Sequence, residues 1–164
     1  MVHCNLEELN YGGLKITVKT ASKPLWLHFP TAGEKVRATG GGLLEHEDST
    51  DITRFSLFGC RPSTSCTSQT VKLAGSPEGL RLFVWFPVGS VSISGGSNYT
   101  GVVWANDVVS NGGVTWTVPG SGVAQAMALA GLGISEDGIS PTDKNPPTFD
   151  WVARATKGFR WFGQ

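Results

Sequence analysis

The sequence predicts an all-β domain, a short right-handed parallel β-helix (β-solenoid), and three observations lead to this fold class. The 164-residue chain has 22 glycines and only 16% charged residues, and glycine weakens helix interiors. Short segments rich in β-branched and aromatic residues follow one another, each ending at glycine or a small polar residue. A weak internal repeat has a period of roughly 17–20 residues, the length of one solenoid coil.

The short apolar segments alternate apolar and polar residues, as half-buried strands do. The clearest alternation is in LKITV, and LWLHF is apolar on both faces. We expect strands at residues 14–18, 25–29, 35–38, 55–58, 71–73, 80–86, 91–93, 101–105, 108–109 and 114–118.

The repeat carries more information than any single strand. The stretch VSISGG at 91–96 recurs as DVVSNGG at 107–113, and the Trp-bearing strands 84–86 and 103–105 are one period apart. One coil cannot bury its own apolar face, but stacking on the next coil buries that face and pairs the backbone. Glycine suits the corners, which often need a positive φ. The alternative is an antiparallel sandwich, which also has short strands at this spacing.

The pattern divides the chain into three parts of one domain. Residues 1–13 form an N-terminal lead-in segment, and residues 14–119 form the solenoid. In residues 120–164 an Ala-rich stretch after Ser121 predicts a short helix at 121–129. The aromatic and basic segment 149–162 then packs back as a cap, because solenoid ends expose unpaired strand edges.

Composition also limits the partners. The formal net charge is zero and no basic stripe is present, so nucleic acid is not an expected partner. No apolar run reaches the length of about 20 residues that a membrane span needs. The sequence MVHCNLEELN lacks the apolar stretch of a signal peptide, which fits a piece of a longer precursor.

Three cysteines bear on the compartment. Cys60 and Cys66 bracket the polar turn-forming loop RPSTS and are a candidate disulfide, with two free thiols as the alternative. A disulfide would imply an oxidising compartment. Cys4 is left over, either free or bonded to a segment outside this sequence.

Candidate chemistry is sparse. The densest acidic cluster is Glu45, Glu47, Asp48 and Asp51 with His46 among them; it could serve glycosidic chemistry or bind Ca²⁺, but we interpret it as a solvated loop. His28 is expected to be a half-buried packing residue. We expect no catalytic residue, no metal and no cofactor.

The six tryptophans could form a sugar-stacking platform, although strand tryptophans with apolar neighbours belong to a core or interface. Trp151 and Trp161 are the candidates for contact with a glycan or a protein partner.

Three segments in order resemble a known family. TDITRFSLFG (50–59), FVWFPVGSVSISGG (83–96) and YTGVVWA (99–105) resemble motifs of cyanobacterial type IV pilin-like proteins, namely hormogonium polysaccharide secretion pseudopilins and PilX-like minor pilins. The opening of the solenoid, 14–29, matches more loosely. The similarity covers roughly residues 14–119.

The resemblance implies a non-catalytic β-helix-like domain that is carried on a pilus or pseudopilus, is extracellular or periplasmic, and contacts other pilus subunits or surface polysaccharide. The family's apolar N-terminal helix and cleavage site are not in this sequence. Under this resemblance, either the N-terminal helix was removed or the chain is a stand-alone relative of the family. Two other functions remain open: a carbohydrate-binding or polysaccharide-active β-helix protein, and a viral fibre domain.

Overall fold

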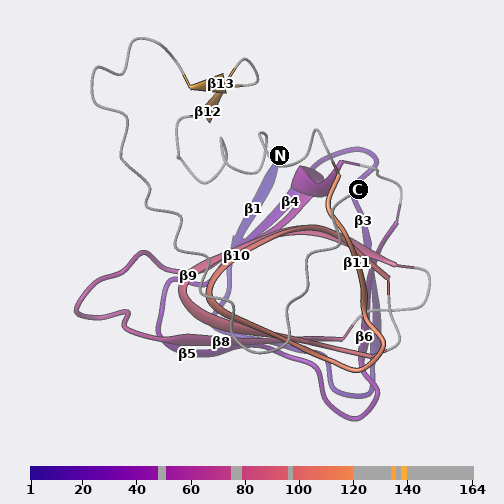
Figure 1. Cartoon of the computed structure of the whole chain (residues 1–164), viewed down its shortest axis with the longest axis horizontal. Coiled ribbons are helices and arrows are strands. Elements are labelled where there is room, and N and C mark those ends of the chain that lie inside the picture. Colours follow the sequence, from indigo (N-terminus) through magenta and orange to yellow (C-terminus); the bar gives the residue numbers. More distant parts are fainter. Residues whose placement is uncertain (48–50, 75–78, 96–97, 120–133, 136–137, 140–164) are drawn as a thin grey trace.

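Parallel β-strands dominate the structure, which is a computed structural model and describes residues 1–47, 51–74, 79–95, 98–119, 134–135 and 138–139. Nine strands form one curled sheet, and β3 and β6 form a separate parallel pair beside it (Figure 1). The curled sheet wraps the core as a half-barrel. The predicted all-β class is therefore confirmed, and the alternative of an antiparallel sandwich is wrong, because the nine strands pair in parallel.

Successive passes of the chain lie on one another along the sheet. The path runs β1-β4-β7-β9-β8-β5-β2, with β10 on β9 and β11 on the start of β10. The strands of this sheet are β1 (Val2–Asn5), β2 (Leu9–Asn10), β4 (Leu25–His28), β5 (Gly33–Arg37), β7 (Phe55–Phe58), β8 (Gln69–Ala74), β9 (Leu80–Ser94), β10 (Asn98–Asn111) and β11 (Thr115–Thr117).

The remaining described elements are short. β3 (Lys15–Lys19) pairs in parallel with β6 (Leu43–Glu47), and the 3-10 helix η1 spans Ile52–Arg54. β12 (Ile134–Ser135) and β13 (Gly138–Ile139) form an antiparallel pair of their own.

Residues that occupy equivalent positions in the sequence repeat pair with one another where β10 lies on β9. Val108 pairs with Val91, and Trp104 pairs with Trp85, each residue meeting its counterpart in the repeat. Ser90 and Asp107 lie side by side at a separation of 17 residues. The period is longer near the N-terminus, where Thr17 contacts Glu45 at a separation of 28 residues, so a uniform period does not hold along the chain.

Most expected strands are present, with two differences. The pairs expected at 80–86 and 91–93, and at 101–105 and 108–109, are single long strands, β9 and β10, because the chain turns the corner without leaving the sheet. The register of β10 on β9 shifts between Ala105 and Asp107 at this bend, which is how a bulge re-aims a strand. The structure also has β1, β2 and β6, which the residue pattern did not predict.

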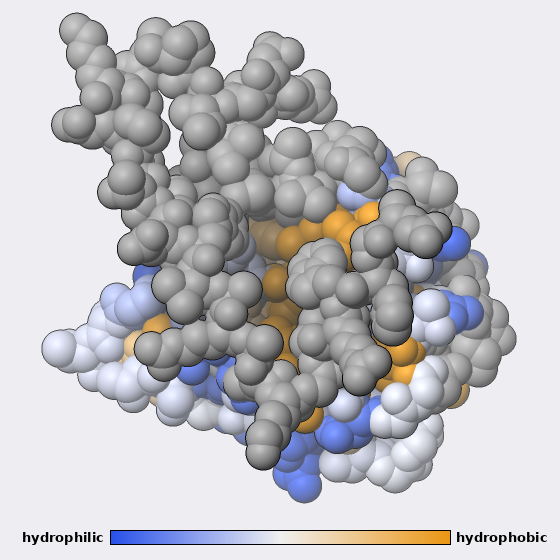
Figure 2. All heavy atoms as spheres, in the orientation of Figure 1, coloured by the Kyte–Doolittle hydropathy of each residue, from blue (hydrophilic) through white to orange (hydrophobic). Residues whose placement is uncertain are grey.

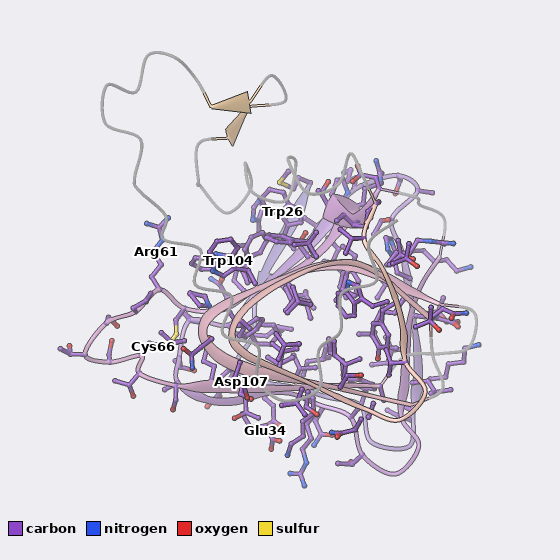
Figure 3. All side chains as sticks on the ribbon, in the orientation of Figure 1. Trp26, Glu34, Arg61, Cys66, Trp104 and Asp107 are labelled. Carbon is purple, nitrogen blue, oxygen red and sulfur yellow. A yellow bond between two sulfur atoms is a disulfide. The ribbon has the colours of Figure 1, made fainter. Side chains whose placement is uncertain are left out.

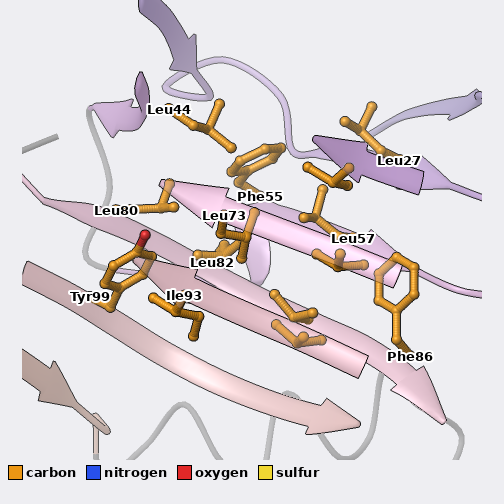
Figure 4. Close-up of a cluster of buried hydrophobic side chains, with 14 of the residues drawn as sticks. Leu27, Leu44, Phe55, Leu57, Leu73, Leu80, Leu82, Phe86, Ile93 and Tyr99 are labelled. Atoms are coloured by element: carbon orange, nitrogen blue, oxygen red, sulfur yellow. The ribbon is translucent and has the colours of Figure 1, made fainter. Parts of the chain in front are cut away.

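The core lies inside the curl and is built from alternate residues of each strand (Figure 4). Phe55 and Leu57 of β7 and Val84 of β9 are fully buried, and Leu82 is 2% exposed. Each such side chain contributes about 1.5–3 kcal/mol through burial. In the end-on view of Figure 2 apolar residues gather at the centre and hydrophilic residues lie toward the rim.

Glycine is required at the corner and at one inward position. Gly95 and Gly112 end β9 and β10 with φ of 103° and 91°, and they stack on one another. A side chain at either position would be strained. Gly101 faces the core, where a Cβ would overlap the Leu82 carbonyl oxygen of the coil beneath. The interpretation of Gly-rich stretches as corners is confirmed at the first two positions.

One buried tyrosine joins the first pass of the chain to the third. Tyr11 is fully buried, and its hydroxyl oxygen accepts from the Ala74 backbone N–H at 3.1 Å. The same hydroxyl lies 3.5 Å from the Ala74 carbonyl oxygen, to which it donates. Burial raises the pKa of Tyr11 from 10.0 to about 12, against a smaller opposing effect of the backbone hydrogen bond. The neutral phenol is therefore part of the folded core.

Two predictions for the C-terminal part lie outside the described residues. These are the helix at 121–129 and the aromatic cap at 149–162.

Candidate interaction surfaces

An apolar cluster lies on the outer face of the sheet, where solenoid side chains usually meet water. Its buried members are Ile52, Phe58 and Phe83, and Trp26 and Trp85 pack against them half-buried; Val102 completes this outer aromatic cluster. Side chains at every second residue of a strand point outward. Phe58 on β7 and Trp85 on β9 are paired in register, so both contribute to the same outward cluster. The sequence therefore places two apolar layers on this sheet, one on each face.

The helix η1 covers the outer aromatic cluster. Ile52 inserts into the cluster at 1% exposure. Asp51 caps η1 by accepting from the Thr53 backbone N–H at 2.9 Å, and Trp26 Nε1 donates to the Thr53 carbonyl oxygen at 3.0 Å. Trp26 thus fastens a loop to the sheet, which is a structural task.

The described tryptophans are half-buried, as expected for packing residues. Trp116 stacks on Tyr99 with ring centroids 5.7 Å apart and planes 5° apart, and its Nε1 donates to the Gly101 carbonyl oxygen at 3.2 Å. Figure 3 shows Trp26 and Trp104 on the same outer side of the curl. The two candidate contact residues, Trp151 and Trp161, lie outside the described residues.

The loop between β7 and β8 is closed by a Cys60–Cys66 disulfide in the structure, with Cα atoms 6.4 Å apart. Both cysteines are buried, at 9% and 2% exposure, whereas Arg61 points away from the body of the domain (Figure 3). Within the loop Ser63 and Cys66 exchange backbone hydrogen bonds of 3.3 and 3.2 Å. These bonds hold the tip RPSTS in one conformation.

A buried glutamine fixes the base of this loop. Gln69 is 2% exposed, and its Oε1 accepts from the Cys60 backbone N–H at 3.1 Å. Its Nε2 donates to the carbonyl oxygens of Phe29 at 2.9 Å and Thr31 at 2.7 Å. One amide therefore ties the loop base to the preceding coil, and every polar atom of the side chain has a partner.

The acidic cluster is not the solvated loop that the sequence suggested. Glu45 and His46 lie on β6 and are 3% and 2% exposed, so the prediction is wrong for these two residues. Glu45 accepts from Thr17 Oγ1 and forms an ion pair with Lys15 at 3.1 Å. Pairing is what permits a carboxylate to be buried. Asp51 caps η1, and Asp48 lies outside the described residues.

His46 is a buried connector between three segments. Its Nδ1 donates to the Arg81 carbonyl oxygen at 2.6 Å, so Nε2 is left to accept from Thr20 Oγ1, also at 2.6 Å. Arg54 Nε donates to the Thr20 carbonyl oxygen at 3.0 Å. The two bonds engage both ring nitrogens of His46, fix its tautomer and join β6 to the start of β9.

The outer side of β5 and β8 is polar and charged. Glu34 pairs with Lys72 at 2.8 Å and with Arg37 at 3.7 Å. The hydrogen bond from Lys72, and then the charges of Lys72 and Arg37, lower the pKa of Glu34. This side contrasts with the outer aromatic cluster, so the faces of the domain offer different chemistry to partners.

The edge of the sheet at β1 brings two histidines together. His3 on β1 and His28 on β4 approach with Nδ1 and Nε2 3.0 Å apart. His28 is half-buried and stacks on Phe58 with centroids 5.1 Å apart, which confirms its expected packing role. The sequence did not predict the pair, because the two residues meet only through the parallel pairing of β1 with β4.

Two features are absent among the described residues. Among them no three His, Cys, Asp or Glu side chains gather in a way that could hold a metal ion. In the same part of the chain no helix has both the length and the apolar character that a membrane crossing needs.

Comparison with known proteins gives no relative. No family model, curated protein or solved structure matches this chain.

Proposed function

We propose that the protein is a closed right-handed β-solenoid acting as a non-catalytic structural, assembly or adhesion module of a type IV pilus or pseudopilus-like surface system. Its location would be extracellular or at the cell surface, with the periplasm as the alternative. Its partners would be other subunits of that system or surface polysaccharide. The observation that carries the proposal is the register-matched stack of β8, β9 and β10.

The stack supports a mechanical task. Val71 pairs with Val91, which pairs with Val108, so one position recurs in three successive coils. Parallel ladders of this kind give a stiff body, and a stiff body presents its loops in fixed places. Closure of the solenoid is supported by the bond from His46 to the Arg81 backbone, because it links β6 to the start of β9.

The loop chemistry supports a location outside the cytoplasm. The Cys60–Cys66 disulfide would persist only in an oxidising compartment. The loop that it closes carries exposed polar residues at a corner of the sheet, which suits contact with a neighbouring subunit.

Localisation in the source cells tests this proposal. An antibody against the chain, used in immunogold electron microscopy, is expected to label filaments or the outer cell surface. Deleting the gene is expected to lower surface attachment or the amount of exported polysaccharide. Label confined to the cytoplasm, or a deletion strain with both properties unchanged, would reject the proposal.

A carbohydrate-binding or polysaccharide-active role is the second candidate, favoured by the register of Trp85 with Trp104 on the outer face. Affinity electrophoresis in gels containing neutral polysaccharides would test binding. Under this candidate Trp85→Ala abolishes retardation and Val109→Ala, on an exposed residue away from the cluster, leaves it unchanged. Release of reducing sugar ends would indicate an enzyme.

A further inference from the structure

The two histidines at the sheet edge are joined ring to ring. His3 Nδ1 lies 3.0 Å from His28 Nε2. The ring planes are 14° apart and the centroids 5.3 Å apart. Rings that are nearly parallel, with nitrogens this close and centroids this far apart, meet edge to edge. This is the geometry of an N–H···N hydrogen bond, well within the usual distance.

Such a bond depends on the proton count of the pair. One facing nitrogen must carry a hydrogen and the other must be bare. A neutral pair satisfies this condition, and so does a pair with one extra proton, in which the bond is charge-assisted and stronger. When both rings are cations, both facing nitrogens carry hydrogen, and the bond is replaced by repulsion between like charges.

Apart from this bond, β1 is held by its four-residue backbone ladder with β4 and by few buried side chains. β1 is the end of the sheet path and pairs only with β4 among the described strands. Met1 and Val2 are 59% and 42% exposed. The β1 side chain that packs against the core is that of Cys4, which is half-buried. Edge segments with few buried contacts open more readily than the rest of a domain.

We propose that the His3–His28 hydrogen bond is an acid-sensitive latch that holds edge strand β1 on β4. Protonation of both rings opens the latch, and β1 then detaches while the remaining coils stay folded. Detachment frees the edge of β4 for pairing with another strand, because an uncovered edge presents unpaired backbone groups.

The protonation of the two histidines is not coupled to another ionisable side chain in contact with their rings. Neither Trp26, whose ring meets His3 edge-on at 5.0 Å, nor Phe58, stacked on His28, can ionise. Met1 also meets the pair, with its Sδ 3.0 Å from His3 Nε2. The nearest ionisable groups along the chain are the Met1 amino group, Cys4, Glu7, Glu8 and Lys23, and none of them is among the causes that shift the pKa of His28. His3 is therefore the only neighbouring charge that acts on it.

The pKa of His28 supports the direction of the switch. Burial, and secondly the charge of His3, lower this pKa from 6.5. A detached His28 binds a proton more readily than a docked one. Docking therefore weakens as the pH falls below 6.5 and through the lowered pKa of His28, where the pair takes up its second proton.

Cys4 provides a site-specific reporter of detachment. It is the free cysteine of the chain, since Cys60 and Cys66 are disulfide-bonded in the structure. 4,4′-Dithiodipyridine labels thiols in mild acid as well as at neutral pH. The labelling rate of the full chain is measured from pH 7.5 to pH 5 and divided by the rate in denaturant at the same pH, which removes the intrinsic pH dependence of the thiol.

The rate ratio is expected to rise severalfold over this range, because docking holds the pKa of His28 below that of the detached residue and acid therefore favours detachment. In the double variant His3→Gln/His28→Gln, which cannot titrate, the ratio is expected to stay flat. The single variant His3→Gln, at an exposed residue, should show an intermediate rise and provides the test if the double variant does not fold.

Internal controls separate the latch from general acid unfolding. Amide hydrogen exchange in β8 should keep its protection over the same pH range, while protection in β1 falls. A flat ratio in the unmodified protein overturns the proposal. So does an equal rise in the histidine variants, or a parallel loss of protection in β8, because each would place the acid sensitivity elsewhere, for example at buried His46.

Discussion

Ionisation of Tyr11 should destabilise this protein in alkali, and Tyr11→Phe should remove that dependence. The phenol is fully buried and burial raises its pKa from 10.0 to about 12. Above pH 10 the unfolded chain loses this proton while the folded chain keeps it, so the free energy of unfolding falls as the pH rises. The loss begins near the unfolded pKa and levels off above the folded one.

The magnitude follows from the shift. Two pKa units correspond to about 2.7 kcal/mol once the loss is complete, and about 1.4 kcal/mol is lost at pH 11. At neutral pH the Tyr11→Phe variant should itself be about 1–2 kcal/mol less stable, because the Ala74 N–H loses its acceptor. The variant and the unmodified protein should therefore converge in stability as the pH rises.

Urea unfolding followed by tryptophan fluorescence at pH 8, 10 and 11 measures both quantities. All other side chains are the same in both proteins, so only the difference between the two reports on Tyr11. A difference that stays constant from pH 8 to pH 11 would refute the reasoning, as would a spectrophotometric titration in which the ionisation missing from the variant is centred near pH 10.

Three further changes test the packing of the coils. Gly101→Ala should lower the free energy of unfolding in urea by more than about 2 kcal/mol, since the added Cβ overlaps backbone that cannot move aside. Gly113→Ala is the matched control and should be nearly neutral, because nothing lies within 4 Å of the added carbon. Gln69→Leu should cost about 2–4 kcal/mol, because it removes the partner of a buried donor, a buried acceptor and a part-buried acceptor. A loss below about 1 kcal/mol would argue against the clamp. Mass spectrometry without reductant should find Cys60 bonded to Cys66, and their double replacement by serine should cost about 2 kcal/mol; two free thiols would contradict the disulfide.

Local chemistry explains why the solenoid-like core was predictable. The strands at 55–58 and 71–73 have apolar residues at alternate positions, and in the folded sheet Phe55, Leu57, Val71 and Leu73 lie in the core. The repeat of VSISGG in DVVSNGG could be recognised in the sequence because Val108 stacks on Val91 and Gly112 lies on Gly95, one coil away. The positions between them pair unlike residues, which is why the repeat is weak.

The candidate surfaces were less accessible to sequence reasoning. Glu45 and His46 look like loop residues because charged side chains are rarely buried alone. Their burial depends on partners such as Thr17 and Thr20, which lie a full coil earlier in the chain. No local sequence pattern indicates such a pairing, so the sequence alone does not predict β6.

The sequence by itself determined the all-β class, the parallel stacking of its repeated part, the glycine corners and the cysteine-bounded loop, because each depends on residues close in the chain or one period apart. Tertiary structure alone decided that Tyr11 reaches Ala74, that Gln69 clamps the loop base, and that His3 meets His28. These contacts depend on coils of unequal length coming into register. Coil length is set by how loops fold over the sheet, and the residues of one coil do not encode that.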